Sequence, residues 1–362
     1  MKALDASNAG ITEPMAHCPA PGAPLESRAH CAGSPRRVFM LGATATIGQA
    51  TVRALVRRGH ELVCFVRPHM ARDEVPADLD TAQSSGSVTL RIGAPGDAMS
   101  LARDGFRCER FDAIVSCMAS RTGTPRDAWA IDHRAQVRAL EAARKAGVAH
   151  FVPLSAICVQ KPRLAFQHAK LAFEKVLVES GMAYSIVRPT AFFKSLSGQI
   201  ERVRRGKPYL LFGDGTLTAC KSISDDDLGA CLADCLDDDK RRNRILPGGG
   251  PGPAITPRQQ GEHLFALLGR TPRFKQVPLG MLDAIIVVLA AAGRLVPALA
   301  DKAELARIGR YYASESMLLL NPATGHCDAG ATPATGSKTL FDFYARVIAG
   351  AAAPQRGDHA VF

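Results

Sequence analysis

The sequence lacks the features that usually mark a metal-binding or nucleic-acid-binding protein. No two of its ten cysteines have CxxC spacing, and no group of histidines and cysteines completes a zinc or iron–sulfur site. Only 6% of the residues are aromatic, and no nucleic-acid recognition motif is present. We therefore expect no protein metal site and no nucleic-acid partner. Most cysteines lie in apolar runs such as residues 63–65, which predicts reduced thiols and a cytoplasmic location.

Long apolar runs are also missing. Residues 1–35 contain no apolar segment of the kind found in signal peptides, and Pro, Ala and Gly dominate them. They predict a disordered N-terminal tail; an organelle transit peptide is the alternative, although Asp5, Glu13 and Glu26 argue against it. The most apolar stretch, residues 284–293, is too short to span a bilayer. It indicates a helix that is either buried in the core or in peripheral contact with a membrane.

Positive charge is in excess, with a formal net charge of +11 at pH 7. The excess indicates either a generally basic surface or attraction to an anion, such as a phosphorylated cofactor, an acidic substrate or an anionic membrane. The length of 362 residues and the hydrophobic content of 47% suffice for two domains, or for one domain with a large addition.

Apolar strands and longer helices alternate in the first half of the chain. Strands are predicted at residues 38–41, 61–66, 88–92, 111–117, 150–154 and 183–187, and helices at 47–58, 127–146 and 164–180. This alternation is typical of parallel βαβ units. It predicts an α/β fold, a Rossmann-like doubly wound parallel sheet, over residues 36–190.

The alternation is lost beyond Pro189, where glycine-rich loops separate helices predicted at 225–236, 257–268, 281–295 and 300–312. We expect residues 191–350 to form a smaller C-terminal α+β region that binds substrate and packs on the Rossmann domain. Residues 351–362 are expected to be a C-terminal tail.

A glycine-containing turn, residues 42–48 (GATATIG), follows the first strand and opens a helix. Gly42 permits a tight turn and Gly48 permits close packing of helix on strand, while the helix N-terminus offers backbone N–H groups to a pyrophosphate. Ala45 stands where the extended fingerprint has glycine, and its methyl group is expected to weaken binding at most. The alternative is a strand–helix turn without a ligand.

Arg67 directly follows the second predicted strand. Sites that prefer NAD carry Asp or Glu at this point, whereas an arginine favours the 2′-phosphate of NADP. The sequence therefore predicts NADPH as the cofactor, with a solvated arginine as the alternative. Residues 116–121 include the end of the fourth strand and the loop after it. This loop is expected to pass close to that cofactor because Rossmann ligands lie beyond the carboxyl ends of strands.

Ser155 ends the fifth predicted strand, and Lys170 lies in the helix that follows it. Short-chain dehydrogenases place a serine here and a Tyr-x-x-x-Lys motif on that helix, with both side chains on one face. The tyrosine position is Phe166 in this chain, and phenylalanine cannot transfer a proton. Carbonyl reduction with a tyrosine acid is therefore not expected, although Lys170 is placed to hold the nicotinamide ribose.

Several long runs resemble a known family. They are residues 155–162, 184–196, 208–215, 246–252 and 308–318. These runs resemble the signature segments of divinyl chlorophyllide 8-vinyl reductases, and the resemblance extends over about residues 38–348. Phe166 agrees with that family, which also lacks the tyrosine, whereas Ala45 replaces the family's usual glycine.

The resemblance implies an atypical, NADPH-dependent short-chain dehydrogenase/reductase of chlorophyll or bacteriochlorophyll synthesis. Its substrate would be a divinyl chlorophyllide or protochlorophyllide, a Mg-tetrapyrrole whose C8 vinyl group is reduced to ethyl. The cofactor would contact Gly42, Ala43, Thr44, Thr46, Ile47, Gly48, Arg67, Cys117, Ala119, Ser120, Lys170, Pro189, Thr190, Ala191 and Phe192. The magnesium belongs to the pigment, unless a histidine of the protein serves as its axial ligand.

The same resemblance implies roles at the reacting end of the site. Lys170 and Ser155 would be catalytic. A wide, flat macrocycle needs apolar and aromatic walls. The candidates for contact with it are Phe193, Phe212, Tyr311 and Tyr312, with Lys194 or Arg310 for its carboxylate.

Hydride transfer to the terminal vinyl carbon would leave charge that spreads into the macrocycle, so no alkoxide needs a proton. The adjacent carbon still needs one, from Lys170, a water molecule or Cys158. Two other functions stay open at this point: a different double-bond reductase with a smaller substrate, and a non-catalytic NADPH-binding regulator or assembly factor, which Phe166 would allow. The sequence indicates no oligomeric state.

Overall fold

The computed structural model describes residues 34–68, 77–84 and 86–351. All of them belong to one compact unit, Ala32–Phe362. The tails expected at 1–35 and 351–362 lie almost entirely outside the described residues, so both remain predictions.

Seven parallel strands form the central sheet, in the order β3-β2-β1-β4-β5-β6-β8. Their bounds are β1 (Arg37–Leu41), β2 (Glu61–Val66), β3 (Val88–Ile92), β4 (Ala113–Ser116), β5 (His150–Pro153), β6 (Ala183–Pro189) and β8 (Arg244–Gly248). The first six strands are those expected from the sequence. The Rossmann-like doubly wound sheet is therefore confirmed.

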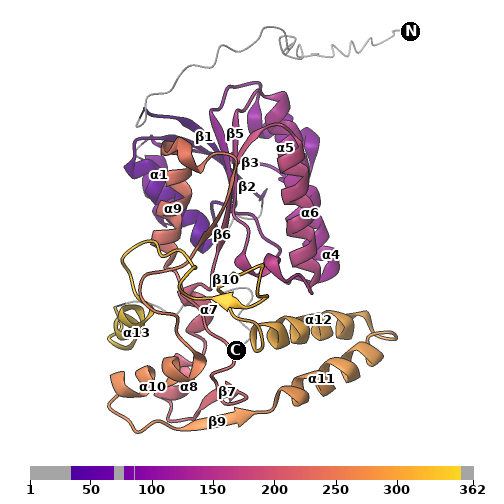
Figure 1. Cartoon of the computed structure of the whole chain (residues 1–362). Helices are drawn as coiled ribbons and strands as arrows, with labels where there is room; N and C mark the ends of the chain where they lie inside the picture. Colours follow the sequence, from indigo (N-terminus) through magenta and orange to yellow (C-terminus); the bar gives the residue numbers. More distant parts are fainter. Residues whose placement is uncertain (1–33, 69–76, 85, 352–362) are drawn as a thin grey trace, which may run out of the picture. The chain divides into compact units, whose positions relative to one another are not determined.

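Helices cover both faces of this sheet (Figure 1). Helices α1 (Thr46–Arg57) and α9 (Asp225–Asp237) lie on one face, and α5 (Gln136–Lys145) and α6 (Ala165–Glu179) on the other. Successive strand residues point to opposite faces. Accordingly Val38 and Met40 pack into the core under α1 and α9, whereas Phe39 and Leu41 pack into the core under α5 and α6.

The helix expected at 127–146 is continuous but not uniform. It begins as α4 (Pro125–Ala128), widens into a π-helical segment at Trp129–Ala135 and continues as α5. Short π-helical segments occur frequently at functional sites. Here the segment contains Asp132, whose side chain is fully buried.

The chain returns to the sheet after Pro189. Strand β8 pairs with β6, and α9 packs beside α1, so part of residues 191–350 belongs to the dinucleotide-binding layers. The expected boundary at residue 190 therefore does not follow the sheet. The sequence of β8, RILPG, contains Pro and Gly and is preceded by a loop, which hides it from a pattern search.

The remaining C-terminal residues form a smaller α+β region with its own apolar core. It holds a two-stranded parallel sheet and a set of helices around it. These elements are α7 (Phe193–Leu196), α8 (Ile200–Arg204), β7 (Tyr209–Phe212), α10 (Pro257–Leu267), β9 (Phe274–Val277) and α13 (Leu340–Ile348). Between α12 (Pro297–Tyr312) and α13, two short strands, β10 (Leu319–Leu320) and β11 (Cys327–Asp328), pair antiparallel.

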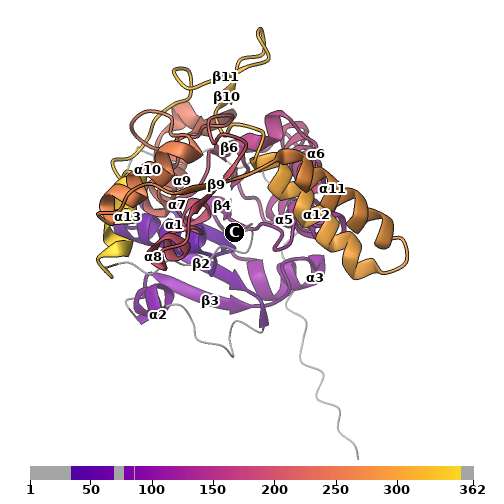
Figure 2. The same cartoon turned by 90° about the horizontal axis from the view of Figure 1, so that it is seen from below.

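Helices α11 (Leu279–Ala292) and α12 (Pro297–Tyr312) lie side by side and project from the rest of the C-terminal region (Figures 1 and 2). No residue of α11, which is described throughout, is buried; Val287 and Val288 are 67% and 66% exposed. The alternative that placed residues 284–293 in the core is therefore wrong. None of the helices in the described part of the chain has the length and apolar content needed to cross a membrane.

Seven cysteines in the described ranges carry free thiols, and all but Cys327 are buried. Burial raises the pKa of the Cys64 thiol to about 12, so this group stays protonated and packs as a small apolar side chain. The expectation of reduced cysteines is wrong for Cys108, which is disulfide-bonded.

Candidate active site

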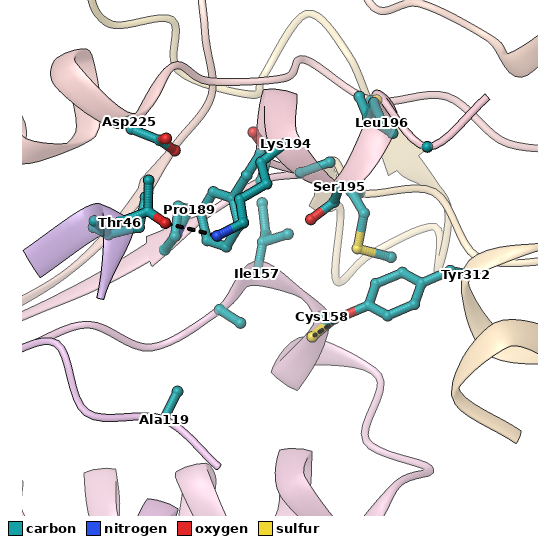
Figure 3. A pocket seen from close by; sticks show the side chains of 18 of the residues that line it. Thr46, Ala119, Ile157, Cys158, Pro189, Lys194, Ser195, Leu196, Asp225 and Tyr312 are labelled. Atoms are coloured by element: carbon teal, nitrogen blue, oxygen red, sulfur yellow. Dashed lines mark hydrogen bonds between the residues drawn. The ribbon is translucent and has the colours of Figure 1, made fainter. Parts of the chain in front are cut away.

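A cavity of about 600 Å³ lies beyond the carboxyl ends of β1, β2, β4, β5 and β6. The loops that follow these strands form one side of it, and the C-terminal region forms the other (Figure 3). This is the position in which open α/β sheets bind ligands, and the volume is within the range of small-molecule sites.

Two backbone positions in the turn at residues 42–48 can be occupied only by glycine. Gly42 has φ +75°, and a Cβ there would lie 2.7 Å from the backbone carbonyl carbon of Cys117. A Cβ on Gly48 would lie 2.0 Å from the carbonyl oxygen of Gly42. Ala45 is exposed and lines the cavity, so its methyl group occupies the side from which a ligand would approach.

The turn opens directly into α1, whose first residue is Thr46. The Gln49 side-chain amide donates to the carbonyl oxygen of Thr44 at 2.8 Å, which fixes the turn against the helix. No side chain caps the N-terminus of α1, and the first two residues of the helix, Thr46 and Ile47, line the cavity. This arrangement can accept a phosphate group.

Arg67 and the loop after β4 lie at two other sides of the cavity. Arg67 is exposed, follows the last residue of β2 and lines the cavity. Cys117, Ala119 and Ser120 line it as well. Burial raises the pKa of the Cys117 thiol to about 12, which excludes a thiolate at neutral pH.

Lys170 lies behind the cavity wall and is not among the residues that line it. Its ammonium group is 3.0 Å from Asp132 Oδ1, and the side chains of Lys170 and Asp132 are 11% and 0% exposed. The same oxygen accepts from the backbone N–H of Ser120 at 3.3 Å. This buried ion pair therefore holds the loop after β4 against α6.

Ser155 is also turned away from the cavity. Its hydroxyl donates to Glu174 Oε1 at 2.5 Å, and Glu174 forms a second ion pair with Arg188. Ser155 and Glu174 are 6% and 4% exposed. The serine thus joins a buried polar network between β5, α6 and β6.

Lys194 lies on the opposite side of the cavity, beside the glycine turn. Its ammonium donates to Thr46 Oγ1 at 2.6 Å (Figure 3). Asp225, the first residue of α9, lines the same part of the cavity. Burial raises the pKa of the Asp225 carboxyl, against the opposing effect of the Lys194 charge.

Cys158 and Tyr312 meet at the far side of the cavity, and both line it. Cys158 Sγ and Tyr312 Oη are 4.0 Å apart (Figure 3). Although 38% of Tyr312 is exposed, its hydroxyl end is enclosed, and this raises the pKa of the phenol well above its ordinary value. Burial likewise raises the pKa of the Cys158 thiol. Both groups therefore carry their protons at neutral pH.

Most residues expected at the site line this one cavity. They are Gly42, Thr44, Thr46, Ile47, Arg67, Cys117, Ala119, Ser120, Pro189, Thr190, Ala191, Phe192, Lys194, Phe212 and Tyr312. Six expected residues do not line it: Ala43, Gly48, Ser155, Lys170, Phe193 and Tyr311.

Each of these six has a structural contact instead. Ala43 and Gly48 are buried beneath the turn, and Phe193 packs against Phe343 in the C-terminal core. The Tyr311 hydroxyl donates to the carbonyl oxygen of Cys158 at 3.0 Å. Arg310, the alternative partner for a carboxylate, is paired with Asp283 at 2.8 Å.

The cavity also contains residues that the sequence patterns did not single out. They include an acidic residue next to the phosphate turn and an apolar wall from the C-terminal region: Asp225, Leu196, Leu210, Leu217, Ile255 and Met317. They come from separate loops, helices and strand β7, so no sequence motif connects them. Across the described ranges, no group of three or more His, Cys, Asp or Glu side chains is placed to hold a metal ion.

Comparison with known proteins agrees with this site. A family model described as NAD(P)H-binding matches residues 42–239. The chloroplastic divinyl chlorophyllide a 8-vinyl-reductase of Oryza sativa subsp. indica is 50% identical over 343 residues, which cover 91% of this chain and 83% of that protein. The chain belongs to the divinyl chlorophyllide a 8-vinyl-reductase family. The resemblance inferred from the sequence runs is thus confirmed.

A second family member, the chloroplastic divinyl chlorophyllide a 8-vinyl-reductase of Zea mays, is 46% identical over 356 residues, 95% of this chain and 87% of that protein. Among solved structures, an NADPH-dependent quinone oxidoreductase from Escherichia coli, complexed with NADPH, superposes with a TM-score of 0.60 at 18% identity. That similarity covers 86% of this chain and 99% of the oxidoreductase. At this identity the likeness shows the fold alone.

Proposed function

We propose that this protein uses NADPH to reduce the C8 vinyl group of a divinyl chlorophyllide-type pigment to an ethyl group. One observation carries the proposal. A single cavity combines a dinucleotide-binding turn with an apolar wall, in a chain that is 50% identical to a named divinyl chlorophyllide a 8-vinyl-reductase. The family membership favours an enzyme over a regulator or an assembly factor.

The residues around the turn fit NADPH. Glycine at position 42 lets the turn pack against the backbone of Cys117, and glycine at position 48 lets α1 start close to Gly42. The start of α1 offers N–H groups to the pyrophosphate. Arg67 offers its guanidinium to the 2′-phosphate. Residues 117–120 and 189–192 would flank the nicotinamide half, and NADPH, when bound, supplies the hydride for the terminal vinyl carbon.

Lys170 would act as a positioning residue rather than as a ligand of the cofactor. Its ammonium neutralises the buried Asp132, and Asp132 in turn holds the Ser120 N–H at the cavity wall. The positive charge of Lys170 also lowers the pKa of the Cys117 and Cys158 thiols, against the larger effect of burial. Both thiols line the cavity. Ser155 would stabilise the neighbouring Glu174–Arg188 pair.

Protonation of the second vinyl carbon requires a donor that faces the cavity. Phe166 carries no acidic proton, and the Lys170 ammonium is committed to Asp132 behind the wall. Tyr312 presents its hydroxyl beside Cys158, and that hydroxyl stays protonated at neutral pH. We therefore assign the donor role to Tyr312: its O–H bond breaks, a C–H bond forms, and the phenolate regains a proton from water.

A turnover assay with the purified full-length protein tests the activity. With NADPH and divinyl chlorophyllide, we expect oxidation of NADPH together with a monovinyl product heavier by two hydrogens. NADPH binding without turnover of any pigment would favour the regulator instead. Reduction of small conjugated alkenes but not of the pigment would favour a different double-bond reductase.

A peripheral membrane contact forms the second part of the proposed function. The α11–α12 hairpin (residues 279–312) exposes Val287, Val288 and, at its tip, Leu295, which is 88% exposed. Asp283, the single charged residue of α11, is paired with Arg310, so apolar side chains dominate the surface of this helix. Apolar surface beside an exposed basic residue, Arg294, in a chain of net charge +11 fits an anionic lipid surface.

Liposome co-sedimentation tests this contact. The double variant Val287→Glu/Val288→Glu is expected to lose most binding to vesicles that contain anionic phospholipid, because two carboxylates would have to enter the lipid interface. Val178→Glu is the matched control, since Val178 is 43% exposed on α6. Unchanged binding of the double variant would contradict the proposal. Loss of a dimer on size exclusion, without any lipid effect, would assign the hairpin to a second copy of the chain.

A further inference from the structure

Lys194 lies at the end of the cavity that contains the glycine turn (residues 42–48). From the sequence, it was expected to contact the carboxylate of the pigment. It directly follows the loop at residues 189–192, in α7. Its ammonium donates to Thr46 Oγ1 at 2.6 Å, and Thr46 is the first residue of α1. The side chain therefore reaches across the cavity to the glycine turn (Figure 3).

The surroundings of this ammonium include a carboxyl group with unused hydrogen-bonding capacity. Asp225 lines the cavity near Thr46 and Lys194, and its Oδ1 is buried without a hydrogen-bond partner among the described residues. The charges of Lys194 and Arg53 favour its ionised form, while burial opposes that form. The Lys194 ammonium and the Asp225 carboxyl group therefore lie together beside the glycine turn that is proposed to bind phosphate.

We propose that Lys194 is a ligand of the cofactor's pyrophosphate and sets the affinity for NADH and NADPH alike. The inference rests on the cofactor site of the proposed function. Backbone N–H groups at a helix start position a phosphate, and a lysine beside them adds a charge-assisted hydrogen bond.

The assignment of Lys194 to the pyrophosphate also bears on Ala45, which stands where the family usually has glycine. Its methyl group lies on the approach side of the turn, where the family's usual glycine would leave the backbone more accessible. A direct ammonium–phosphate contact made beside Thr46, the residue after Ala45, offsets the contacts that this methyl group weakens. Lys194 is thus expected to carry a larger share of pyrophosphate binding here than it would beside a glycine.

Fluorescence titration of the full-length protein with reduced cofactors tests the proposal without any pigment. Lys194→Met is expected to weaken NADPH and NADH binding by the same factor, about 10- to 100-fold, the size of one hydrogen bond to a charged group. Arg67→Met is the matched control. It is expected to weaken NADPH binding and to leave NADH binding unchanged, because NADH lacks the 2′-phosphate.

Two outcomes would overturn the assignment. If Lys194→Met binds both cofactors like the wild type while the KM for the pigment rises, Lys194 belongs to the substrate carboxylate. If it weakens NADPH alone, Lys194 belongs to the 2′-phosphate end. An unchanged unfolding temperature without cofactor shows that the variant is folded. A wild-type protein that binds neither cofactor would instead refute the proposed function itself.

Discussion

Replacing Lys170 with methionine is expected to lower the free energy of unfolding by about 3–5 kcal/mol, the usual cost of leaving a buried charge without its partner. The Asp132 side chain is 0% exposed, and its Oδ2 already lacks a hydrogen-bond partner among the described residues. Without the ammonium, Asp132 must either remain charged in an apolar setting or take up a proton. Urea denaturation monitored by far-UV circular dichroism measures the loss.

Two further variants separate the buried pair from an effect of charge in general. Lys175 lies on the same helix; its side chain is 76% exposed, and its Nζ is 3.8 Å from Glu179 Oε1. The variant Lys175→Met is expected to change the free energy of unfolding by less than about 0.5 kcal/mol. The double variant Lys170→Met/Asp132→Leu removes both charges, and it is expected to recover most of the lost stability. A Lys170→Met protein as stable as the wild type would contradict the ion-pair assignment.

The Lys170→Met variant also tests the role of the ion pair in cofactor binding. The pair holds Ser120 at the cavity wall, so its loss is expected to weaken NADPH binding as well as stability. In the double variant, recovered stability with weakened NADPH binding would identify positioning of the Ser120 loop as the role of the pair. If Lys170→Ala retained full turnover, an essential role of this lysine would be ruled out.

The sheet could be predicted from the sequence because its early strands are short, mostly apolar runs, and several are followed by a helix that stops at a glycine. Residues 38–41 show this pattern, since they lie in β1 and are followed by α1, which ends just before Gly59. Strand β8 could not be found in this way, because Pro247 and Gly248 are poor strand formers and nothing local marks their pairing with β6. Its place follows from tertiary packing alone.

The cofactor end of the site was predictable for a related reason. Its turn, helix start and Arg67 follow directly after two predicted strands, so the fold itself brings them to one edge of the sheet. The roles of Ser155 and Lys170 could not be judged from position. Whether such a side chain faces a ligand or a buried partner depends on Glu174 and Asp132, which lie elsewhere in the sequence.

The proton donor is the clearest case of information that only the tertiary structure holds. Tyr312 is far from Cys158 in sequence, and no spacing rule relates the end of α12 to the loop after β5. From the sequence, Tyr312 was expected only as an aromatic contact for the pigment. The structure adds that its hydroxyl end is directed to Cys158 inside the cavity.

Tyr312→Phe is expected to lower kcat by about 100-fold or more, the usual contribution of a positioned proton donor. The ring remains, so the KM for the pigment and the affinity for NADPH are expected to change little. Because enclosure raises the pKa of Tyr312, the donor stays protonated, and the wild-type kcat is expected not to fall as pH rises through neutrality. Steady-state kinetics over a pH series measures both.

Tyr311→Phe provides the matched control on the neighbouring residue. The Tyr311 hydroxyl donates to the carbonyl oxygens of Cys158 and Lys161 and does not face the cavity, so its loss is expected to cost about 1 kcal/mol of stability and to leave kcat nearly unchanged. Cys158→Ala distinguishes the two groups of the pair. If Cys158→Ala abolished turnover and Tyr312→Phe did not, the thiol would be the donor, because each change removes one acidic proton and leaves the other in place.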